Sequence, residues 1–446
     1  MNVAVGNGTK TLIDVLDNLT RSTSAVVFPE LDFSYPHKDI PSAAARFASV
    51  LHERGVSLGD VVGILVPSSP DFMPCLFGVL FRGAAASILP FPTTVGSLDS
   101  AVDTVEAFLE AGGITALVVD AGIGRVIGQH LLTRRPRLIL IRSDERGSVA
   151  AQVADIAPDT AAIVQFSSGS TARPKGVVLN HETVIAGLNA INGRMRTTED
   201  DVVVQWVPLY HDMGLFGLMC SLRGGYHDHL FTPIEFVRNT ERYIDYIGQV
   251  RGTITTGPNF AYRRIAAAAR RRDASSANPD LSTWRLAING GEAVQTRTVE
   301  EFSLSLSRFG VSPATMFPSY GMAEATLAIS MPTPGDTPRP TAFARESLEI
   351  GRVPVECSAG DVNAVSLVSV GHCMDNLAVR IGDSAGNLHC GSGVGEIQVR
   401  GTSLFQRYLD NQRATADSWH AGWFFTGDLG FIADGRLYIA GGSKIW

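Results

Sequence analysis

Short apolar runs rich in β-branched residues recur along most of this chain, and segments with helical periodicity separate them. A regular alternation of such runs with helices is typical of layered α/β structure with mostly parallel sheets. The sequence therefore predicts an α/β fold with two layered subdomains, at roughly residues 1–190 and 191–335. The runs lie at residues 61–66, 116–119, 138–141, 161–166, 202–207 and 253–256.

The pattern changes after Ser369, where glycine-bearing turns such as residues 383–386 separate shorter apolar segments. These segments lie at residues 377–381, 395–400 and 437–440. They indicate a smaller β-rich subdomain at about residues 366–440. Before it, residues 332–365 are rich in Pro, Gly, Thr and Ala and show little periodicity, which predicts a linker or a long functional insertion.

Length and charge limit the classes of function. At 446 residues the chain can form roughly three folding units, and its 45 glycines and 22 prolines suit a loop-rich α/β enzyme. The net charge of −7 is spread along the chain, so we expect no nucleic-acid partner. The densest basic stretch, residues 263–272, is interpreted as a solvated helix face, with an anion or carrier-protein docking patch as the alternative.

Cysteine usage and hydropathy predict a cytoplasmic protein without structural metal. The first ten residues lack the charged and apolar parts of a signal peptide. Pro74 and Arg82 interrupt the most apolar stretch, residues 72–92, before it reaches the roughly 20 apolar residues that span a bilayer, so we expect no membrane span. The cysteines are far apart, with no Cys-x-x-Cys pair and no histidine at zinc-ligand spacing: Cys75, Cys220, Cys357, Cys373 and Cys390.

Residues 165–176, Gln-Phe-Ser-Ser-Gly-Ser-Thr-Ala-Arg-Pro-Lys-Gly, lie between two apolar runs and have the composition of a phosphate cradle. Small residues let backbone N–H groups approach phosphate oxygens, and Lys175 supplies positive charge. Lys175 follows Gly169 by six positions, so the spacing is not that of a Walker A loop. The alternative is a serine-rich surface hairpin. The hydroxyl donors are Ser167, Ser168, Ser170 and Thr171.

This run resembles the phosphate loop of the adenylate-forming superfamily, which contains acyl-CoA synthetases, peptide-synthetase adenylation domains and luciferases. Three further motifs follow in the order of that superfamily, at residues 289–293, 318–325 and 426–430. The resemblance implies the fold of the large N-terminal domain of an adenylate-forming enzyme, here residues 1–440. It also implies ATP and Mg²⁺ as cofactors.

The resemblance assigns a role to each motif. Tyr320 offers an aromatic face on which adenine can stack. Glu324 is a hard oxygen donor for Mg²⁺, and Asp428 can accept hydrogen bonds from the ribose hydroxyls. Each residue taken alone is more often structural, as a core tyrosine, a helix glutamate or a turn aspartate. The remaining nucleotide-binding candidates are Asn289, Gly290, Gly291, Glu292, Ser319, Gly321, Met322 and Ala323.

Within the superfamily the chain resembles the fatty acyl-AMP ligases over nearly its whole length. The resemblance is clearest at residues 206–215, 257–262, 280–284 and 320–327. Ala323 stands where many other branches carry threonine. Residues 337–368 fall where these ligases carry an insertion that is associated with poor use of coenzyme A.

The resemblance also indicates where the acid binds. It places His211 at the carboxylate and the α-phosphate, where it would position the acid rather than transfer a proton, since a carboxylate has no proton to lose. A lone histidine after an aromatic residue is more often a satisfied core group. Asp212, Phe260 and Tyr262 are the other candidates for acyl binding.

Two weaker patterns are interpreted as structural. The glycines of residues 122–128 do not match a dinucleotide fingerprint, because the last one is a position late and no acidic residue follows at about 20 residues. His227 and His229 lack a third ligand nearby, so we expect strand or loop rather than a metal site.

The implied reaction is attack of a fatty-acid-like carboxylate on the α-phosphorus of ATP, which gives acyl-AMP and pyrophosphate. We expect the acyl group to pass to an acyl carrier protein. The alternatives are an acyl- or aryl-CoA ligase and a nucleotide- and acyl-binding module with little turnover. Residues 441–446 are interpreted as the remnant of a hinge in which Gly442 and Ile445 replace an arginine and an aspartate, with no lysine-bearing C-terminal domain after it.

Overall fold

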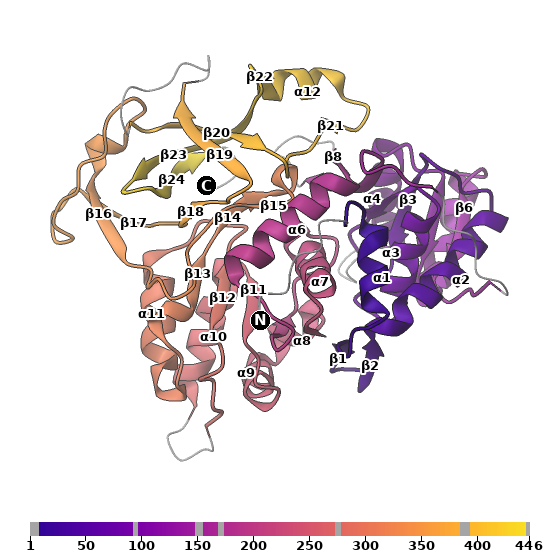
Figure 1. Ribbon diagram of the computed structural model, residues 1–446, viewed down its shortest axis with the longest axis horizontal. Helices are drawn as coiled ribbons and strands as arrows, with labels where there is room; N and C mark the ends of the chain where they lie inside the picture. The colour runs from indigo at the N-terminus through magenta and orange to yellow at the C-terminus, as the bar shows by residue number, and fades with distance from the viewer. Residues whose placement is uncertain are drawn as a thin grey trace. The chain divides into compact units, whose positions relative to one another are not determined.

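The computed structural model describes residues 9–91, 97–147, 155–167, 174–272, 278–383 and 393–442. It contains two compact units, each formed by three segments of the chain (Figure 1). Unit 1 comprises Met1–Leu188, Pro208–Leu230 and Ser403–Gln412, and unit 2 comprises Asn189–Val207, Phe231–Thr402 and Arg413–Trp446. Helices α6 (His181–Met195) and α12 (Gln412–Ser418) contain residues of both units.

Unit 1 is built on a seven-stranded sheet with the strand order β21-β8-β7-β4-β3-β5-β6. The pairs among β7, β4, β3, β5 and β6 are parallel, whereas β7 with β8 and β8 with β21 are antiparallel. The strands are β3 (Val61–Leu65), β4 (Ala85–Ile88), β5 (Ala116–Val119), β6 (Ile139–Arg142), β7 (Ala161–Ser167), β8 (Lys175–Asn180) and β21 (Arg407–Tyr408).

The described part of unit 1 also contains strands β1, β2 and β10 and several helices besides the first part of α6. Strand β1 (Ala25–Phe28) pairs with β10 (His227–Leu230) in parallel and with β2 (Phe33–Pro36) in antiparallel orientation. A core of Leu, Val and Ile side chains packs α4 and α5 against the sheet. The helices are α1 (Leu12–Leu19), α2 (Ile40–Glu53), α3 (Phe72–Phe81), α4 (Leu98–Ala111), α5 (Ala121–Arg134) and α7 (Asp212–Gly224).

The most apolar part of the sequence forms a core helix. Every residue of α3 is buried, which is expected of a helix that is apolar on all sides. At ten residues α3 is too short to span a bilayer. Across the residues that the structure describes, no helix is both long enough and apolar enough to cross a membrane.

Unit 2 combines a parallel sheet with antiparallel sheets. Strands β9 (Val202–Gln205), β11 (Ile254–Gly257), β12 (Leu286–Asn289) and β13 (Met316–Pro318) pair in parallel in the order β13-β12-β11-β9. The helices are α8 (Pro233–Arg238), α9 (Thr240–Gln249), α10 (Asn259–Arg271) and α11 (Thr296–Leu306).

The antiparallel sheets follow along the chain. They contain β14 (Tyr320–Met322), β15 (Leu327–Met331) and β18 (His372–Cys373); β16 (Pro340–Ala344) and β17 (Ala364–Val368); and β19 (Leu377–Gly382), β20 (Gly395–Gly401), β22 (Trp419–His420), β23 (Trp423–Ala433) and β24 (Arg436–Gly442).

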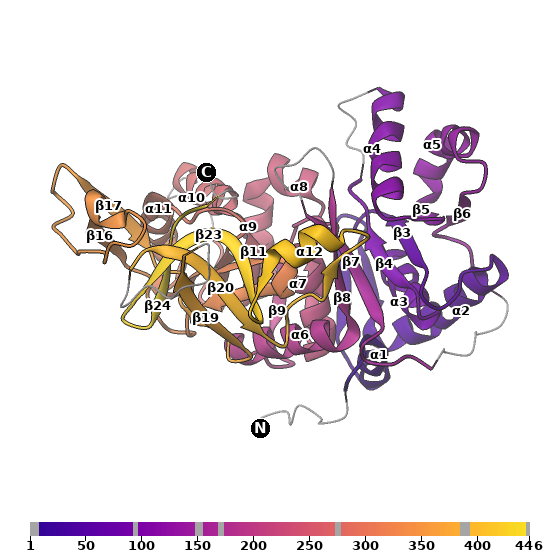
Figure 2. The same cartoon turned by 90° about the horizontal axis from the view of Figure 1, so that it is seen from above.

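The insertion-like segment, residues 337–368, contains two antiparallel strands, which residues 345–363 connect. Strands β16 and β17 pair over five residue positions (Figure 2). Phe343 in β16 packs edge-on against Phe431 and Tyr438 of the C-terminal sheet. A strand pair of this length would be marginal alone, so this aromatic cluster anchors it.

The weaker sequence patterns have structural roles. The glycines of residues 122–128 lie inside α5, and the two histidines flanking Asp228 lie on β10. The basic stretch lies mainly on α10, where Arg270, Arg271 and Arg272 contact Glu301, Glu241 and Asp245. These ion pairs support the interpretation as a solvated helix face.

Two buried histidines make the stability of the chain sensitive to acid. His37 and His181 are fully buried, and within the described residues no hydrogen-bond partner meets the Nε2 atom of either. Burial lowers the pKa of each ring from near 6.5 to about 4, with a smaller contribution from His227 at His37. The unfolded chain therefore takes up protons between these values that the folded chain does not.

We predict that the free energy of unfolding falls as the pH drops from about 6.5 to 4, by about 3 kcal/mol for each ring. Thermal unfolding followed across this range checks the prediction. His181→Asn should flatten the pH dependence, and His52→Asn, at an exposed site on α2, should not. An unchanged slope in His181→Asn would contradict the assignment.

Candidate active site

The predicted phosphate cradle joins two paired strands of unit 1. Ser167 at the end of β7 pairs with Lys175 at the start of β8. The Lys175 ammonium lies over the ring of Tyr408, 5.5 Å from its centroid, within the range of a cation–π contact. Four of the predicted phosphate-binding residues lie outside the described residues: Ser168, Gly169, Ser170 and Thr171.

Gln165 links this hairpin to the start of α7. Its side-chain nitrogen donates to the backbone oxygen of Tyr210 at 2.6 Å, and Tyr210 precedes His211, the N-cap residue of α7. The His211 side chain is exposed and makes no capping hydrogen bond. Asp212 Oδ1 accepts the N–H of Met213. In unit 1 this hydrogen bond joins β7, which pairs with the strand that begins at Lys175, to the residue that precedes His211.

In unit 2 the predicted motifs start where parallel strands end. Gly257, Asn289 and Pro318 are aligned at the carboxyl ends of β11, β12 and β13. Ligands of open α/β sheets bind outside this edge. Ser319 donates its N–H to the Asn289 carbonyl at 2.8 Å, which connects the second and third motifs.

The segment after Asn289 also fixes the start of α10. Gly291 has a φ of +77°, in the left-handed region, and Glu292 Oε1 accepts the N–H of Phe260 at 2.7 Å. Phe260 is 43% exposed, whereas Tyr262 is fully buried and donates its hydroxyl to the Ile288 carbonyl. Of these two acyl-binding candidates, Phe260 is therefore the one whose side chain is exposed. Acyl binding stays a prediction for both residues.

A tight turn shapes the third motif. Gly321 allows β14 to lie against β15, because an added Cβ would come within 1.6 Å of the Leu327 carbonyl oxygen. Thr326 and Leu327 have positive φ angles of 48° and 79°, which close the turn. Met322, Ala323 and Glu324 are buried in unit 2.

The Tyr320 hydroxyl donates to Asp428 Oδ2 at 2.8 Å, so the adenine and ribose candidates are in direct contact. Burial, followed by the charge of Asp428, raises the pKa of Tyr320 well above 10, and Glu324 adds to this effect. Tyr320 therefore remains a hydrogen-bond donor at neutral pH. Two predicted residues from separate motifs therefore meet in unit 2, and Glu324 follows Tyr320 by four positions in the same motif.

Glu324 fits a magnesium ligand of the kind used in nucleotide sites. Within the part of the chain that the structure describes, no three His, Cys, Asp or Glu side chains form a metal-binding group. Mg²⁺ needs no such group, because it is commonly held by one or two carboxylates together with substrate phosphates. The buried carboxylate of Glu324 has the chemistry that suits the ion.

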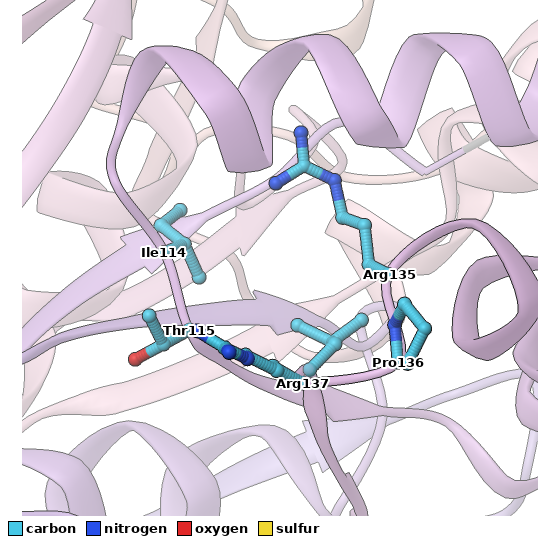
Figure 3. Close-up of a pocket in the computed structure, with 6 residues that line it drawn as sticks. Ile114, Thr115, Arg135, Pro136 and Arg137 are labelled. Atoms are coloured by element: carbon cyan, nitrogen blue, oxygen red, sulfur yellow. The ribbon is translucent and has the colours of Figure 1, made fainter.

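One cavity lies away from these residues. It has a volume of about 380 Å³ and is lined by Ile114, Thr115 and residues 135–138 (Figure 3). These residues precede β5 and β6, so the cavity opens at the amino ends of the parallel strands. Ser167 ends β7, which runs parallel to them, so the phosphate hairpin lies at the opposite edge of this sheet.

Three contacts around the site were not predicted from the sequence: Gln165 with Tyr210, Tyr408 with Lys175, and Thr426 with Asp428. Gln165 and Thr426 lie inside predicted motifs, and the polarity of Gln165 in an apolar strand was a usable signal. Tyr408 carries no comparable signal, because its strand contains only two residues.

The fold and these motif residues define an adenylate-forming enzyme. The profile of the AMP-binding enzyme family matches residues 18–409, so the chain belongs to that family. It is 32% identical over 450 residues to the medium-chain fatty acid–acyl carrier protein ligase JamA of Moorena producens, covering 96% of this chain and 73% of that protein. It is 30% identical over 448 residues to the long-chain fatty acid–AMP ligase FadD32 of Mycolicibacterium smegmatis, covering 93% and 71%.

Solved structures agree with these relatives. The chain matches one from a study of the fatty acyl-adenylate ligases of E. coli and L. pneumophila with a TM-score of 0.89 and 26% identity, covering 97% of this chain and 79% of that chain. It matches the L. pneumophila ligase in complex with acyl adenylate and pyrophosphate with a TM-score of 0.86 and 26% identity, covering 97% and 77%. Within the AMP-binding family the chain is a fatty acyl-AMP ligase, an ATP-dependent enzyme that activates acids.

Proposed function

We propose that this chain converts a fatty acid and ATP into acyl-AMP and pyrophosphate, with Mg²⁺, and that the acyl group then passes to the thiol of an acyl carrier protein. The observation that carries this proposal is the buried set formed by Tyr320, by Asp428, which accepts its hydroxyl, and by Glu324, which follows Tyr320 by four positions. Its two carboxylates and one aromatic ring match what ribose, Mg²⁺ and adenine each require. The carrier-protein step is supported by the name of a relative, the ligase JamA.

The chemistry requires positioning and charge neutralisation rather than covalent catalysis. Lys175 neutralises phosphate charge, and His211 orients the attacking carboxylate. Mg²⁺ held by Glu324 would supply further positive charge to the phosphates. The backbone from Asn289 to Glu292, with Ser319 and residues 321–323, lines the adenine beside Tyr320.

Phe260 offers an apolar surface for the acyl chain. Its ring meets Trp206 edge-on at 5.8 Å, and Trp206 stacks on Phe236 at 4.1 Å. Asp212 and Tyr262 are the other residues proposed to bind the acyl group. Tyr262 is buried, so it would support the exposed residues from the core. Side chains this well packed present a fixed surface to a flexible ligand.

Mass spectrometry tests the function directly. The purified chain, ATP and Mg²⁺ are incubated with acids from four to eighteen carbons, and we expect acyl-AMP from a subset of the longer acids. Coenzyme A and a phosphopantetheinylated acyl carrier protein are then supplied separately, and we expect AMP release with the carrier protein. Efficient formation of acyl-CoA would instead favour an acyl-CoA ligase. ATP binding without any acyl-AMP would favour a binding module.

A further inference from the structure

Tyr320 and Asp428 are 108 positions apart in the sequence and form a buried hydrogen bond in unit 2. Tyr320 is 7% exposed and Asp428 is 2% exposed. The bond is charge-assisted, because a hydroxyl donates to a carboxylate, and such bonds are shorter and stronger than neutral ones. One oxygen of the Asp428 carboxylate is therefore held in a fixed direction.

The backbone on both sides of Asp428 is also fixed. Thr426 Oγ1 accepts the N–H of Asp428 at 3.1 Å and donates to the Ile397 carbonyl at 2.8 Å. Glu396 Oε1 accepts the N–H of Gly427 at 3.0 Å. Gly427 has a φ of +77°, and the pairing of β20 with β23 shifts register at this point. Irregularities of this kind change the direction in which the next side chain points.

We propose that the Tyr320 hydroxyl is a positioning group that orients Asp428 toward the ribose and so couples adenine stacking to recognition of the ribose hydroxyls. This inference rests on the proposed nucleotide-binding function of the same residues. The ring and the hydroxyl of Tyr320 then have separate tasks, because the ring faces the base and the hydroxyl holds the carboxylate. Thr426 completes the arrangement from the backbone side.

The two tasks can be separated experimentally. Tyr320→Phe keeps the ring and removes only the hydroxyl, so base stacking is retained and the Asp428 carboxylate loses its fixed direction. The defect should therefore depend on the ribose hydroxyls of the ligand. Thr426→Val keeps the shape of the side chain and removes the two hydrogen bonds behind Asp428, together with the interaction of Thr426 with the Tyr320 hydroxyl. It tests the same arrangement with the Tyr320 side chain itself retained.

The measurement is calorimetric titration of ATP, 2′-deoxy-ATP and 3′-deoxy-ATP into each variant. We expect the wild type to bind at least one deoxynucleotide about 10- to 100-fold more weakly than ATP, since a hydrogen bond to a charged group contributes about 1.5–3 kcal/mol. In Tyr320→Phe and Thr426→Val this ratio should fall to about threefold, and in Asp428→Ala it should vanish. The matched control is Tyr243→Phe, which removes a buried hydroxyl that donates to the Val204 carbonyl. It should keep the wild-type ratio.

A full deoxynucleotide penalty in Tyr320→Phe would overturn the proposal, even if the variant were less stable, because it would show a structural role only. Tighter ATP binding by that variant would also overturn it, because the hydroxyl would then compete with ribose. A wild type that does not distinguish ATP from its deoxy forms would do the same. Because nucleotide binding is measured without an acid, its result is independent of the acyl-AMP assay. An intact ribose penalty without acyl-AMP would refute the proposed reaction alone.

Discussion

Glu324→Gln is expected to lower the rate of acyl-AMP formation by about 10³-fold while leaving the fold intact. Gln has nearly the same shape and volume, so the buried site beside Tyr320 stays filled. It lacks the negative charge that Mg²⁺ prefers in its ligands. Removing one preorganised charged group typically costs about 10²–10³ in rate, and weaker retention of the ion adds to this cost.

The rate of pyrophosphate release measures this effect, with thermal unfolding as the check on the fold. Glu300→Gln is the matched control, because Glu300 is an exposed residue of α11 in the same unit. It should turn over like the wild type. Excess Mg²⁺ should restore part of the activity of Glu324→Gln. Wild-type turnover in Glu324→Gln would remove Glu324 from the metal site.

Lys175→Met is expected to reduce turnover by about 10²–10³-fold, because it removes the positive charge at the phosphate hairpin. Met retains the length of the side chain and its packing near Tyr408. The loss should be specific to phosphates. ATP and pyrophosphate should bind more weakly, and adenosine should bind as it does to the wild type.

Lys38→Met provides the control, since Lys38 is exposed on unit 1 and far in sequence from the hairpin. Its turnover and its affinity for ATP should be unchanged. Parallel titrations with ATP and adenosine distinguish the loss of the Lys175 charge from a general disruption of the nucleotide site. If Lys175→Met weakened ATP and adenosine equally, the residue would have a structural role and not a phosphate-binding one.

Much of the fold could be predicted from local patterns. The runs at residues 61–66, 116–119 and 161–166 are strands, because a short β-branched run flanked by helices has few other ways to be buried. The structure of residues 340–368 was harder to predict from the sequence. Their strand pair is stabilised by Phe343 against Phe431 and Tyr438, a contact across about 90 residues that no local periodicity reveals.

The candidate site was likewise predictable only in part from the sequence. The types of residue at positions 320, 324 and 428 indicate their chemistry, because an aromatic ring and two carboxylates have a restricted set of uses at a nucleotide. The hydrogen bond between Tyr320 and Asp428, and the tether from Gln165 to Tyr210, depend on how strands from distant parts of the chain are brought together. Sequence spacing carries no information on such contacts.

The most direct test of the account is exchange of labelled pyrophosphate into ATP. The exchange requires acyl-AMP and pyrophosphate on the enzyme together, so it reports the adenylation step without any acceptor. We predict that label enters ATP only when a fatty acid is present, and that Glu324→Gln and Lys175→Met lower the rate of this exchange by about 10²–10³-fold. Tight ATP binding with no exchange for any acid would contradict the account and identify the chain as a nucleotide-binding module.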